Sequence, residues 1–142
     1  MGKKRKVKRV VLDTNVILSA LLFKGKLSKI VELWGNGSFI PLISKEIFKE
    51  LQRTLEYPKF HLTKNERFLI INDYILPYFE VVDVAEPLNN VCRDEDDDKF
   101  LSCAISGDCD LIVSGDMDLL SLKSYKDVKI ITPSEFLSIC KI

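Results

Sequence analysis

The stretch 9-RVVLDTNVILSALLF-23 decides the fold class, because the spacing of its apolar residues changes at a single aspartate. The run before Asp13 is short, apolar and β-branched, and it follows a charged terminus, which is typical of a buried strand. After Asp13 the apolar residues take the spacing of one helical face. These residues are Val16, Ile17, Ala20 and Leu21. The stretch therefore predicts a strand and a helix with a carboxylate between them.

The alternation of strands and helices continues along the chain. Further strands are expected over residues 38–43, 79–84, 110–115 and 128–132. Further helices are expected over residues 27–35, 44–57, 63–77, from about 96, around 119–122, and over 133–140. This order predicts an α/β fold, a three-layer α/β/α sandwich around a mostly parallel sheet. We expect a single domain over residues 9–142, preceded by a basic arm over residues 1–8.

Length and composition are consistent with one globular domain. A chain of 142 residues is long enough to bury a core, and its 46% hydrophobic content excludes global disorder. No apolar run approaches the roughly 18–20 residues that a membrane span requires. The basic start leads into an apolar run interrupted by Asp13 and Asn15, which does not favour a signal peptide. We therefore expect a cytoplasmic protein.

The cysteines do not predict a disulfide framework or a zinc site. The four cysteines form no CxxC pair, and His61 is the only histidine. Reduced thiols are the simplest interpretation. His61 has no partner that would make it a general base, so water activation would have to come from a metal ion.

The net charge of zero conceals an asymmetry between the arm and the rest of the chain. Six of the 21 basic residues lie at the start, so the other 15 face 21 acidic residues. These six are Lys3, Lys4, Arg5, Lys6, Lys8 and Arg9. The arm fits three interpretations, namely contacts to RNA phosphates, a nuclear-import sequence, or a solvated terminus. Its residues are weak candidates for RNA contact.

Two aspartates stand where buried strands end. Asp13 follows the strand VVL, and Asp116 follows the strand LIV with a Ser-Gly pair between. In parallel α/β sheets, ligands bind beyond the carboxyl ends of the strands. A single aspartate at such a position often only caps the next helix. Two aspartates at equivalent strand ends favour a binding site.

The acidic run 94-DEDDD-98 leads directly into a helical pattern. At about 100° per residue, Asp97 points along the apolar face formed by residues 100–105, whereas Asp98 lies a quarter turn away and can be solvated. A buried carboxylate is costly unless it is paired or binds a metal ion, and the sequence shows no obvious basic partner. The run therefore predicts a cation ligand at Asp97, while helix capping suits Asp94 or Asp96.

A fourth acid, Glu50, borders the apolar stripe of its helix and by itself suits a solvated edge. Together with Asp13, Asp97 and Asp116 it would form an all-oxygen cluster suited to Mg²⁺ or Mn²⁺. One ion or two could be held, and two could activate water and stabilise the leaving oxygen in phosphodiester cleavage.

Five blocks of the sequence, spanning about residues 9–139 in order, resemble the PIN-domain nucleases. The blocks are 12-LDTNVILSALL-22, 44-SKEIFKELQRTL-55, 96-DDDKFLSCA-104, 112-IVSGDMDLL-120 and 130-IITPSEFL-137. The resemblance is closest to the small prokaryotic VapC-like branch, the toxins of toxin–antitoxin pairs. It implies a PIN-like α/β/α fold and a nuclease that requires Mg²⁺ or Mn²⁺.

The resemblance also implies roles for individual residues. The metal-site acids of the family fall on Asp13, Glu50, Asp97 and Asp116, which would be both metal ligands and catalytic residues. Its polar helper positions fall on Asn15, Ser114 and Asp118, and Asp118 is a further candidate ligand. The third block of the family usually reads Asp-Pro-Asp-Asp, whereas Glu95 replaces the proline here. This departure leaves neighbouring aspartates as candidates, with Asp94 as an accessory ligand.

The combined hypothesis is a metal-dependent endoribonuclease that cuts single-stranded or loop RNA by metal-activated water. Its expected partners are RNA, a small antitoxin protein and a second copy of the chain. The second copy is expected because the helices over residues 27–55 offer more apolar surface than one core needs. One alternative is a catalytically silent PIN-type module that docks an antitoxin or assembles an RNA-processing complex. A metal-dependent phosphatase is the other, although Asn15 stands where a nucleophilic Asp-x-Asp motif would have its second acid.

Overall fold

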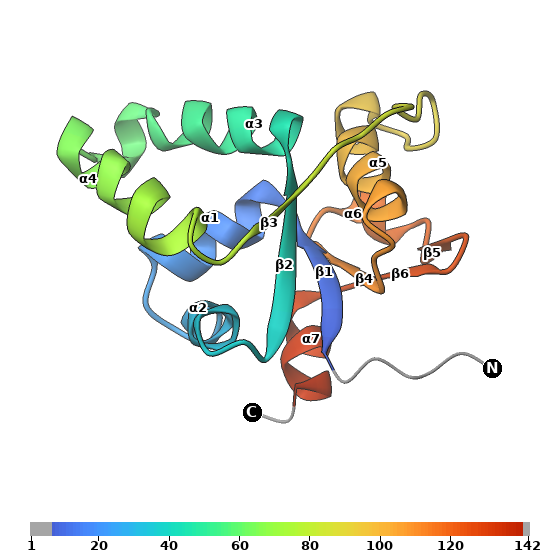
Figure 1. Cartoon of the computed structure of the whole chain (residues 1–142), viewed down its shortest axis with the longest axis horizontal. Helices are drawn as coiled ribbons and strands as arrows, with labels where there is room; N and C mark the ends of the chain where they lie inside the picture. The colour runs from blue at the N-terminus through green and yellow to red at the C-terminus, as the bar shows by residue number, and fades with distance from the viewer. Residues whose placement is uncertain (1–6, 141–142) are drawn as a thin grey trace.

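The computed structural model describes residues 7–140 and contains one six-stranded sheet in the order β3–β2–β1–β4–β6–β5 (Figure 1). Neighbouring strands are parallel except β5, which pairs antiparallel with β6. The strands are β1 (Lys8–Leu12), β2 (Phe39–Ser44), β3 (Glu80–Val82), β4 (Leu111–Val113), β5 (Ser124–Tyr125) and β6 (Val128–Ile131). β1 thus begins one residue before the predicted domain boundary.

Helices cover both faces of this sheet. They are α1 (Thr14–Leu22), α2 (Ser28–Gly35), α3 (Lys45–Leu55), α4 (Lys64–Leu69), α5 (Asp98–Ser106), α6 (Met117–Leu120) and α7 (Pro133–Ile139). Three irregular turns join them, namely η1 (Pro58–Phe60), η2 (Ile70–Ile75) and η3 (Glu95–Asp97). α2 packs on β2, whereas α5 packs on β1, β2 and β4 from the other side (Figure 1). The predicted α/β class with a mostly parallel sheet is confirmed.

The core sits on both sides of β1, one of the two central strands of the sheet. Val10, Val11 and Leu12 are almost inaccessible to solvent, because β2 and β4 flank the strand and helices cover it. A parallel strand buried on both faces has a continuous apolar sequence rather than an alternating one, as this strand does. Two edge-to-face aromatic pairs, Trp34 with Phe79 and Phe39 with Phe136, belong to the same buried core.

The topology creates a crevice at the carboxyl edge of the sheet. From β1 the chain moves outward to β2 and β3 on one side, and it later returns to place β4 on the other side. The connections after β1 and β4 therefore leave in different directions, which opens the sheet at this switch point. Asp13 follows β1 and Asp116 lies shortly after β4, so both stand at this crevice.

Several capping residues start helices where the sequence predicted. Ser44 caps α3 by accepting from the backbone of Ile47, and Thr63 forms a reciprocal capping box with Glu66 at α4. The helix predicted over residues 63–77 is instead α4 followed by a π-helical turn, η2.

Two other segments differ from the prediction. The acidic helix begins at Asp98 rather than near 96, because a 3₁₀ turn over Glu95–Asp97 precedes it. The two-residue strand β5 was not predicted, since so short a segment has no periodic pattern.

Among the residues that the structure covers, no helix has both the length and the apolar character to cross a membrane.

Candidate active site

The carboxylate of Asp13 occupies the switch point between β1 and β4. It caps α1, with Oδ1 accepting from the backbone N–H of Val16 at 2.9 Å, and only 4% of the residue is exposed. Its Oδ2 accepts a short hydrogen bond from the hydroxyl of Ser114. Burial raises the pKa of the Asp13 carboxyl, and these hydrogen bonds partly oppose that effect. Asp13 is therefore both a helix cap and a carboxylate fixed in place.

Ser114 connects Asp13 to the second strand-end aspartate. While its hydroxyl donates to Asp13, its oxygen accepts from the backbone N–H of Asp116 at 2.9 Å. Asp116 in turn caps α6 by accepting from the backbone N–H of Asp118 at 2.8 Å. The first turn of α6 is thus aligned with the end of β1 by a fully buried serine.

Asp97 enters the same space from the 3₁₀ turn η3, directly before α5. It is 7% exposed, and within residues 7–140 its Oδ2 has no hydrogen-bond partner. Burial, followed by the nearby charge of Asp116, raises the pKa of Asp97 to about 7, and Asp94 and Asp13 act in the same direction. A buried oxygen without a partner, facing other carboxylates, has the environment that a cation would relieve.

Three carboxylates have the spacing of a metal site. Oxygen atoms of Asp94, Asp97 and Asp118 all lie within 4.8 Å of one another. Asp118 also pairs with the exposed side chain of Arg93 at 3.4 Å. Hard oxygen ligands of this kind suit Mg²⁺ or Mn²⁺ rather than zinc or copper. The donor set and the unpartnered oxygen of Asp97 therefore fit a divalent cation.

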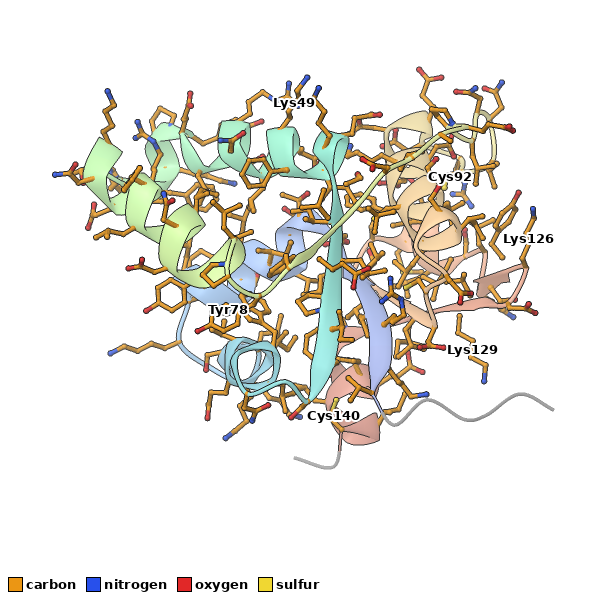
Figure 2. All side chains as sticks on the ribbon, viewed as in Figure 1. Lys49, Tyr78, Cys92, Lys126, Lys129 and Cys140 are labelled. Atoms are coloured by element: carbon orange, nitrogen blue, oxygen red, sulfur yellow. The ribbon has the colours of Figure 1, made fainter. Side chains whose placement is uncertain are left out.

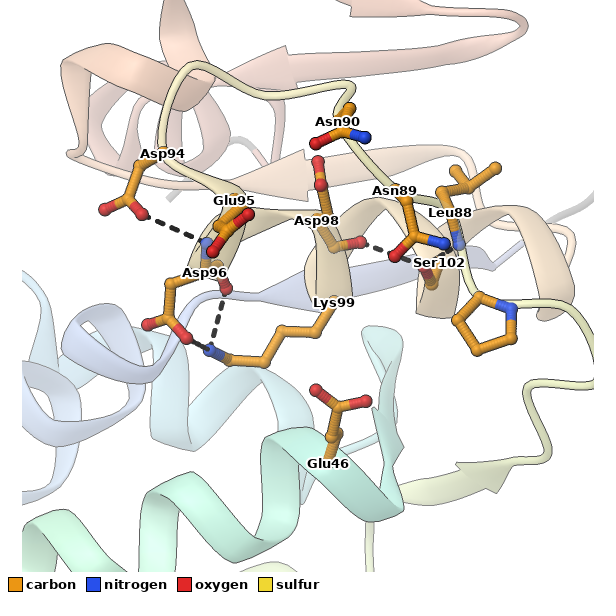
Figure 3. A pocket seen from close by; sticks show the side chains of 11 residues that line it. Glu46, Leu88, Asn89, Asn90, Asp94, Glu95, Asp96, Asp98, Lys99 and Ser102 are labelled. Atoms are coloured by element: carbon orange, nitrogen blue, oxygen red, sulfur yellow. Dashed lines mark hydrogen bonds and ion pairs between the residues drawn. The ribbon is translucent and has the colours of Figure 1, made fainter.

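Glu50 is held by a lysine rather than by that group of three. The ammonium of Lys99 pairs with the Glu50 carboxylate and with Asp96, whose carboxylate lies at 3.1 Å and whose backbone oxygen lies at 2.8 Å. Only 7% of the Lys99 side chain is exposed. Figure 3 shows the lysine extended from α5 towards α3, with its nitrogen bonded at Asp96. Lys99 is a basic partner that the helical pattern did not reveal.

The expectation that Asp98 is solvated is wrong. The residue is 5% exposed, and its carboxylate accepts from the backbone N–H of Cys92 at 2.7 Å. The segment 87–93 lies over this side of α5, and an open pocket of about 730 Å³ lies between residues 87–90 and the start of α5, with Glu46 of α3 also lining it. In Figure 3 the carboxylates of Asp94 and Asp98 point to opposite sides of the acidic segment. Asp98 thus fixes a loop, whereas Asp94 faces Asp97.

The other predicted residues fall in two places. The exposed Asn15 lies in the first turn of α1, where its backbone N–H helps to stabilise the charged form of Asp13. Lys3, Lys4, Arg5 and Lys6 lie outside the described residues. Lys8 and Arg9 belong to β1, and Arg9 donates to Glu80 and to the backbone oxygen of Gly107. Arg9 therefore joins elements at the amino end of β1, away from the carboxylates.

Without metal, the free energy of unfolding should fall as the pH rises from about 4 to about 7. An aspartate in an unfolded chain has a pKa of about 3.9, whereas that of Asp97 is about 7. Between these values the folded state keeps a proton that the unfolded state has lost, so a higher pH favours unfolding until the effect levels off. Urea unfolding in EDTA across this range measures the slope. Asp97→Asn should flatten it, and an identical slope in both proteins would contradict the assignment.

The fold and the acidic crevice define a parallel α/β protein whose carboxylates are arranged for a divalent cation. The family model described as "PIN domain" matches residues 9–118. The chain is also 36% identical, over a 152-residue alignment, to the uncharacterized protein MJ1680 of Methanocaldococcus jannaschii, covering 96% of this chain and 95% of that protein. The chain belongs to the PIN domain family.

Solved structures share this fold at low sequence identity. VapBC2 from Rickettsia felis, bound to a DNA fragment from its promoter, superposes with a TM-score of 0.57 at 16% identity, over 87% of this chain and 98% of that one. FitAcB from Neisseria gonorrhoeae superposes with a TM-score of 0.58 at 18% sequence identity, over 88% of this chain and 98% of that chain. The PIN domain endonuclease Utp24 superposes with a TM-score of 0.55 at 18% sequence identity, over 87% of this chain and 84% of that chain. Family membership, this fold and the acidic cluster together support a nuclease.

Proposed function

We propose that the protein is a metal-dependent endoribonuclease that hydrolyses phosphodiester bonds of single-stranded or loop RNA. The observation that carries this proposal is Asp97, a buried carboxylate that faces Asp13 and Asp116 and has an oxygen without a described partner. Like charges held this close are unfavourable unless a cation lies among them. The VapC-like sequence pattern supports RNA as the substrate.

Asp13, Asp97 and Asp116 would hold Mg²⁺ or Mn²⁺, with Asp94 and Asp118 as further ligands from the adjoining turns. Such a cation, when bound, supplies Lewis acidity and a water of lowered pKa for attack on phosphorus. The residues of the chain keep the carboxylates in place, because Ser114 bonds to Asp13 and to the backbone of Asp116 at once. Without a cation the carboxylates would repel an RNA phosphate, so metal and RNA binding should be linked.

Glu50 is proposed as the fourth acid of the site, placed by Lys99. The lysine joins α3 to the start of α5 through Glu50 and Asp96. It thereby lowers the negative charge at one side of the crevice and fixes the distance between the two helices. We propose that the carboxylate of Glu50 is available to a metal ion or its water while Lys99 holds it in place.

A homodimer and a small antitoxin partner belong to the same proposal. No large apolar side chain is strongly exposed over residues 27–55, which corrects the surface expected from the sequence. Six of the exposed large apolar side chains lie instead on α4, η2 and the segment after them. They are Phe68, Leu69, Tyr74, Leu76, Tyr78 and Val81, between 43% and 66% exposed. An apolar area of this kind is typical of a protein-binding surface. The VapC-like pattern and the likeness to VapBC2 support an antitoxin as one partner.

Metal titration and RNA cleavage test this function directly. We expect Mn²⁺ to raise the melting temperature, since an ion that binds only the folded state stabilises it. A single-stranded RNA labelled at one end should be cut internally with Mn²⁺ and left intact in EDTA. Hydrolysis of a phosphomonoester without cleavage of RNA or of a simple diester would favour the phosphatase alternative. Metal binding without any hydrolysis would favour the silent binding module.

A further inference from the structure

A small pocket lies along α1 beside the acidic crevice. Its volume is about 310 Å³, and α1 lines one wall while η1 lines the other. The residues that line it are Asn15, Leu18, Ser19, Phe23, Lys59 and Phe60. The four from the α1 segment follow the spacing of one helical face. No acidic residue is among the six, in contrast to the neighbouring crevice.

The pocket lies next to the candidate active site, because Asn15 stands two residues after Asp13 in the first turn of α1. Asn15 lines the pocket, and its backbone N–H faces the carboxylate of Asp13. Phe23 caps the far end of the helix, eight residues further along, which is about 12 Å at the rise of an α-helix. The residues of the pocket thus run along α1 from beside Asp13 to the far end of the helix, a length that a strand of RNA could follow.

Two aromatic rings make the far end of the pocket suited to stacking. Phe23 is 57% exposed, although it is a large apolar side chain, and Phe60 is partly buried against the core. The ammonium of Lys59 lies 5.2 Å from the centre of the Phe60 ring. Aromatic side chains accompanied by cations are the usual platforms for unpaired bases, which they bind with little preference for sequence.

Polar and basic groups complete the chemistry that a nucleotide requires. Asn15 and Ser19 provide an amide and a hydroxyl that can hydrogen-bond to the edge of a base. Lys24 and Lys26, both exposed, follow Phe23 directly, and Lys59 is exposed on the opposite wall. The ammonium groups of these three lysines can contact RNA phosphates. The carboxylates of the crevice, by contrast, repel RNA phosphates in the absence of metal.

We propose that this pocket binds an unpaired nucleobase of the substrate, close to the phosphate that is cut, by stacking it against Phe23 and Phe60. The proposal rests on the proposed ribonuclease function, and it identifies what selects single-stranded over paired RNA at this site. A base within a duplex is stacked on its neighbours and cannot enter the pocket.

The test combines Phe23→Ala and Phe60→Ala with abasic RNA. A single-stranded oligoribonucleotide is made with one abasic position at a time on either side of the cleavage site. For the native protein, one such position should raise KM and the Kd from fluorescence anisotropy by roughly 5- to 150-fold, the range of one stacked base. The double variant should bind the intact RNA as weakly as the native protein binds the abasic RNA. The abasic position should change the KM and Kd of the double variant by less than about 2-fold, because both changes remove the same contact.

Two controls separate this effect from misfolding and from loss of the nuclease. Tyr125→Ala removes a comparable aromatic residue with a lysine 5.7 Å from its ring, on strand β5 at the edge of the sheet, and should leave RNA binding unchanged. Cleavage of bis-p-nitrophenyl phosphate, a diester without a base, should be retained in the double variant. Phe23→Ala alone changes an exposed side chain and keeps the test valid if Phe60→Ala unfolds the protein.

The outcomes are distinct. One outcome is that the native protein cleaves RNA normally, while KM and Kd are unchanged at every abasic position and in both variants. This outcome would overturn the pocket proposal and leave the proposed nuclease function standing. A native protein that cuts neither RNA nor the simple diester would overturn the proposed function, and anisotropy with the same RNAs would still decide the pocket. The pocket proposal would also be overturned if the double variant bound RNA as the native protein does but lost binding to a protein partner.

Discussion

Asp97→Asn should lower the single-turnover rate of RNA cleavage by on the order of 10³-fold or more, measured at saturating RNA and Mn²⁺. Asparagine keeps the shape of the side chain but is neutral, and Mg²⁺ and Mn²⁺ prefer anionic oxygen ligands. The native carboxylate is buried and faces Asp13 and Asp116, so the substitution removes a negative charge from the middle of the acidic crevice.

The same substitution should make the metal-free protein more stable at pH 8. The pKa of Asp97 is raised to about 7, so at pH 8 the native protein holds an unfavourable charge that asparagine removes. The rise in melting temperature on adding Mn²⁺ should shrink, because a ligand is lost. Opposite signs for stability and activity are characteristic of a functional residue rather than a structural one.

Glu95→Gln is the matched control for Asp97→Asn. Glu95 lies in the same 3₁₀ turn, is exposed, and loses the same single charge. Its substitution should change the cleavage rate by less than about 2-fold and the stability within about 0.5 kcal/mol. Asp98→Asn is unsuitable, because the buried Asp98 carboxylate anchors the backbone of Cys92. Equal activity of the Asp97 and Glu95 variants would refute the assignment of Asp97.

Those parts of the fold that depend on local signals could be predicted from the sequence. The apolar run before Asp13 is buried on both faces of a parallel sheet, so it shows no alternation and reads as a core strand. Ser44 and Thr63 mark helix starts, because the bonds they make lie within three residues of themselves. Neither signal requires knowledge of distant contacts.

The inward direction of the Asp97 side chain was also predictable, even though α5 begins at Asp98, one residue after Asp97. Helical rotation relative to residues 100–105 is a property of the local backbone, and the 3₁₀ turn shifts it only slightly. The burial of Asp98 was not predictable, because it depends on the segment 87–93, which has no periodic pattern and folds over α5. The same holds for the pocket, which is lined by both Phe23 and Phe60, 37 positions apart in the sequence.

The position of Lys99 shows a further limit of periodicity. Its link to Asp96 follows helical spacing, but its link to Glu50 joins α5 to α3, and only the packing of the two helices brings them together. Helical rotation assigns a direction to a side chain, whereas a lysine can extend several bonds to reach a carboxylate on another element. The helical pattern of the sequence therefore gives no sign of such a pair.

Lys99→Met should destabilise the metal-free protein by about 2–3 kcal/mol, measured by urea unfolding in EDTA. Methionine fills the buried space of the lysine stem but leaves Glu50 and Asp96 without their shared cation, near a crevice that is already negative. Asp96 is largely exposed and is easily resolvated, so most of the loss should come from Glu50. Lys49→Met is the control, since Lys49 lies on α3 and points into solvent (Figure 2).

The response of the Lys99→Met variant to metal distinguishes a positioning role from simple packing. With the ammonium gone, the crevice carries one more unbalanced negative charge, so Mn²⁺ should raise the melting temperature of the variant more than that of the native protein. Lys99→Arg keeps the charge but not the compact ammonium, and should restore the native response to metal only in part. An equal loss of stability with and without Mn²⁺ would show that Lys99 only packs. Recovery of stability by Mn²⁺ would show that the lysine and the metal neutralise the same set of acids.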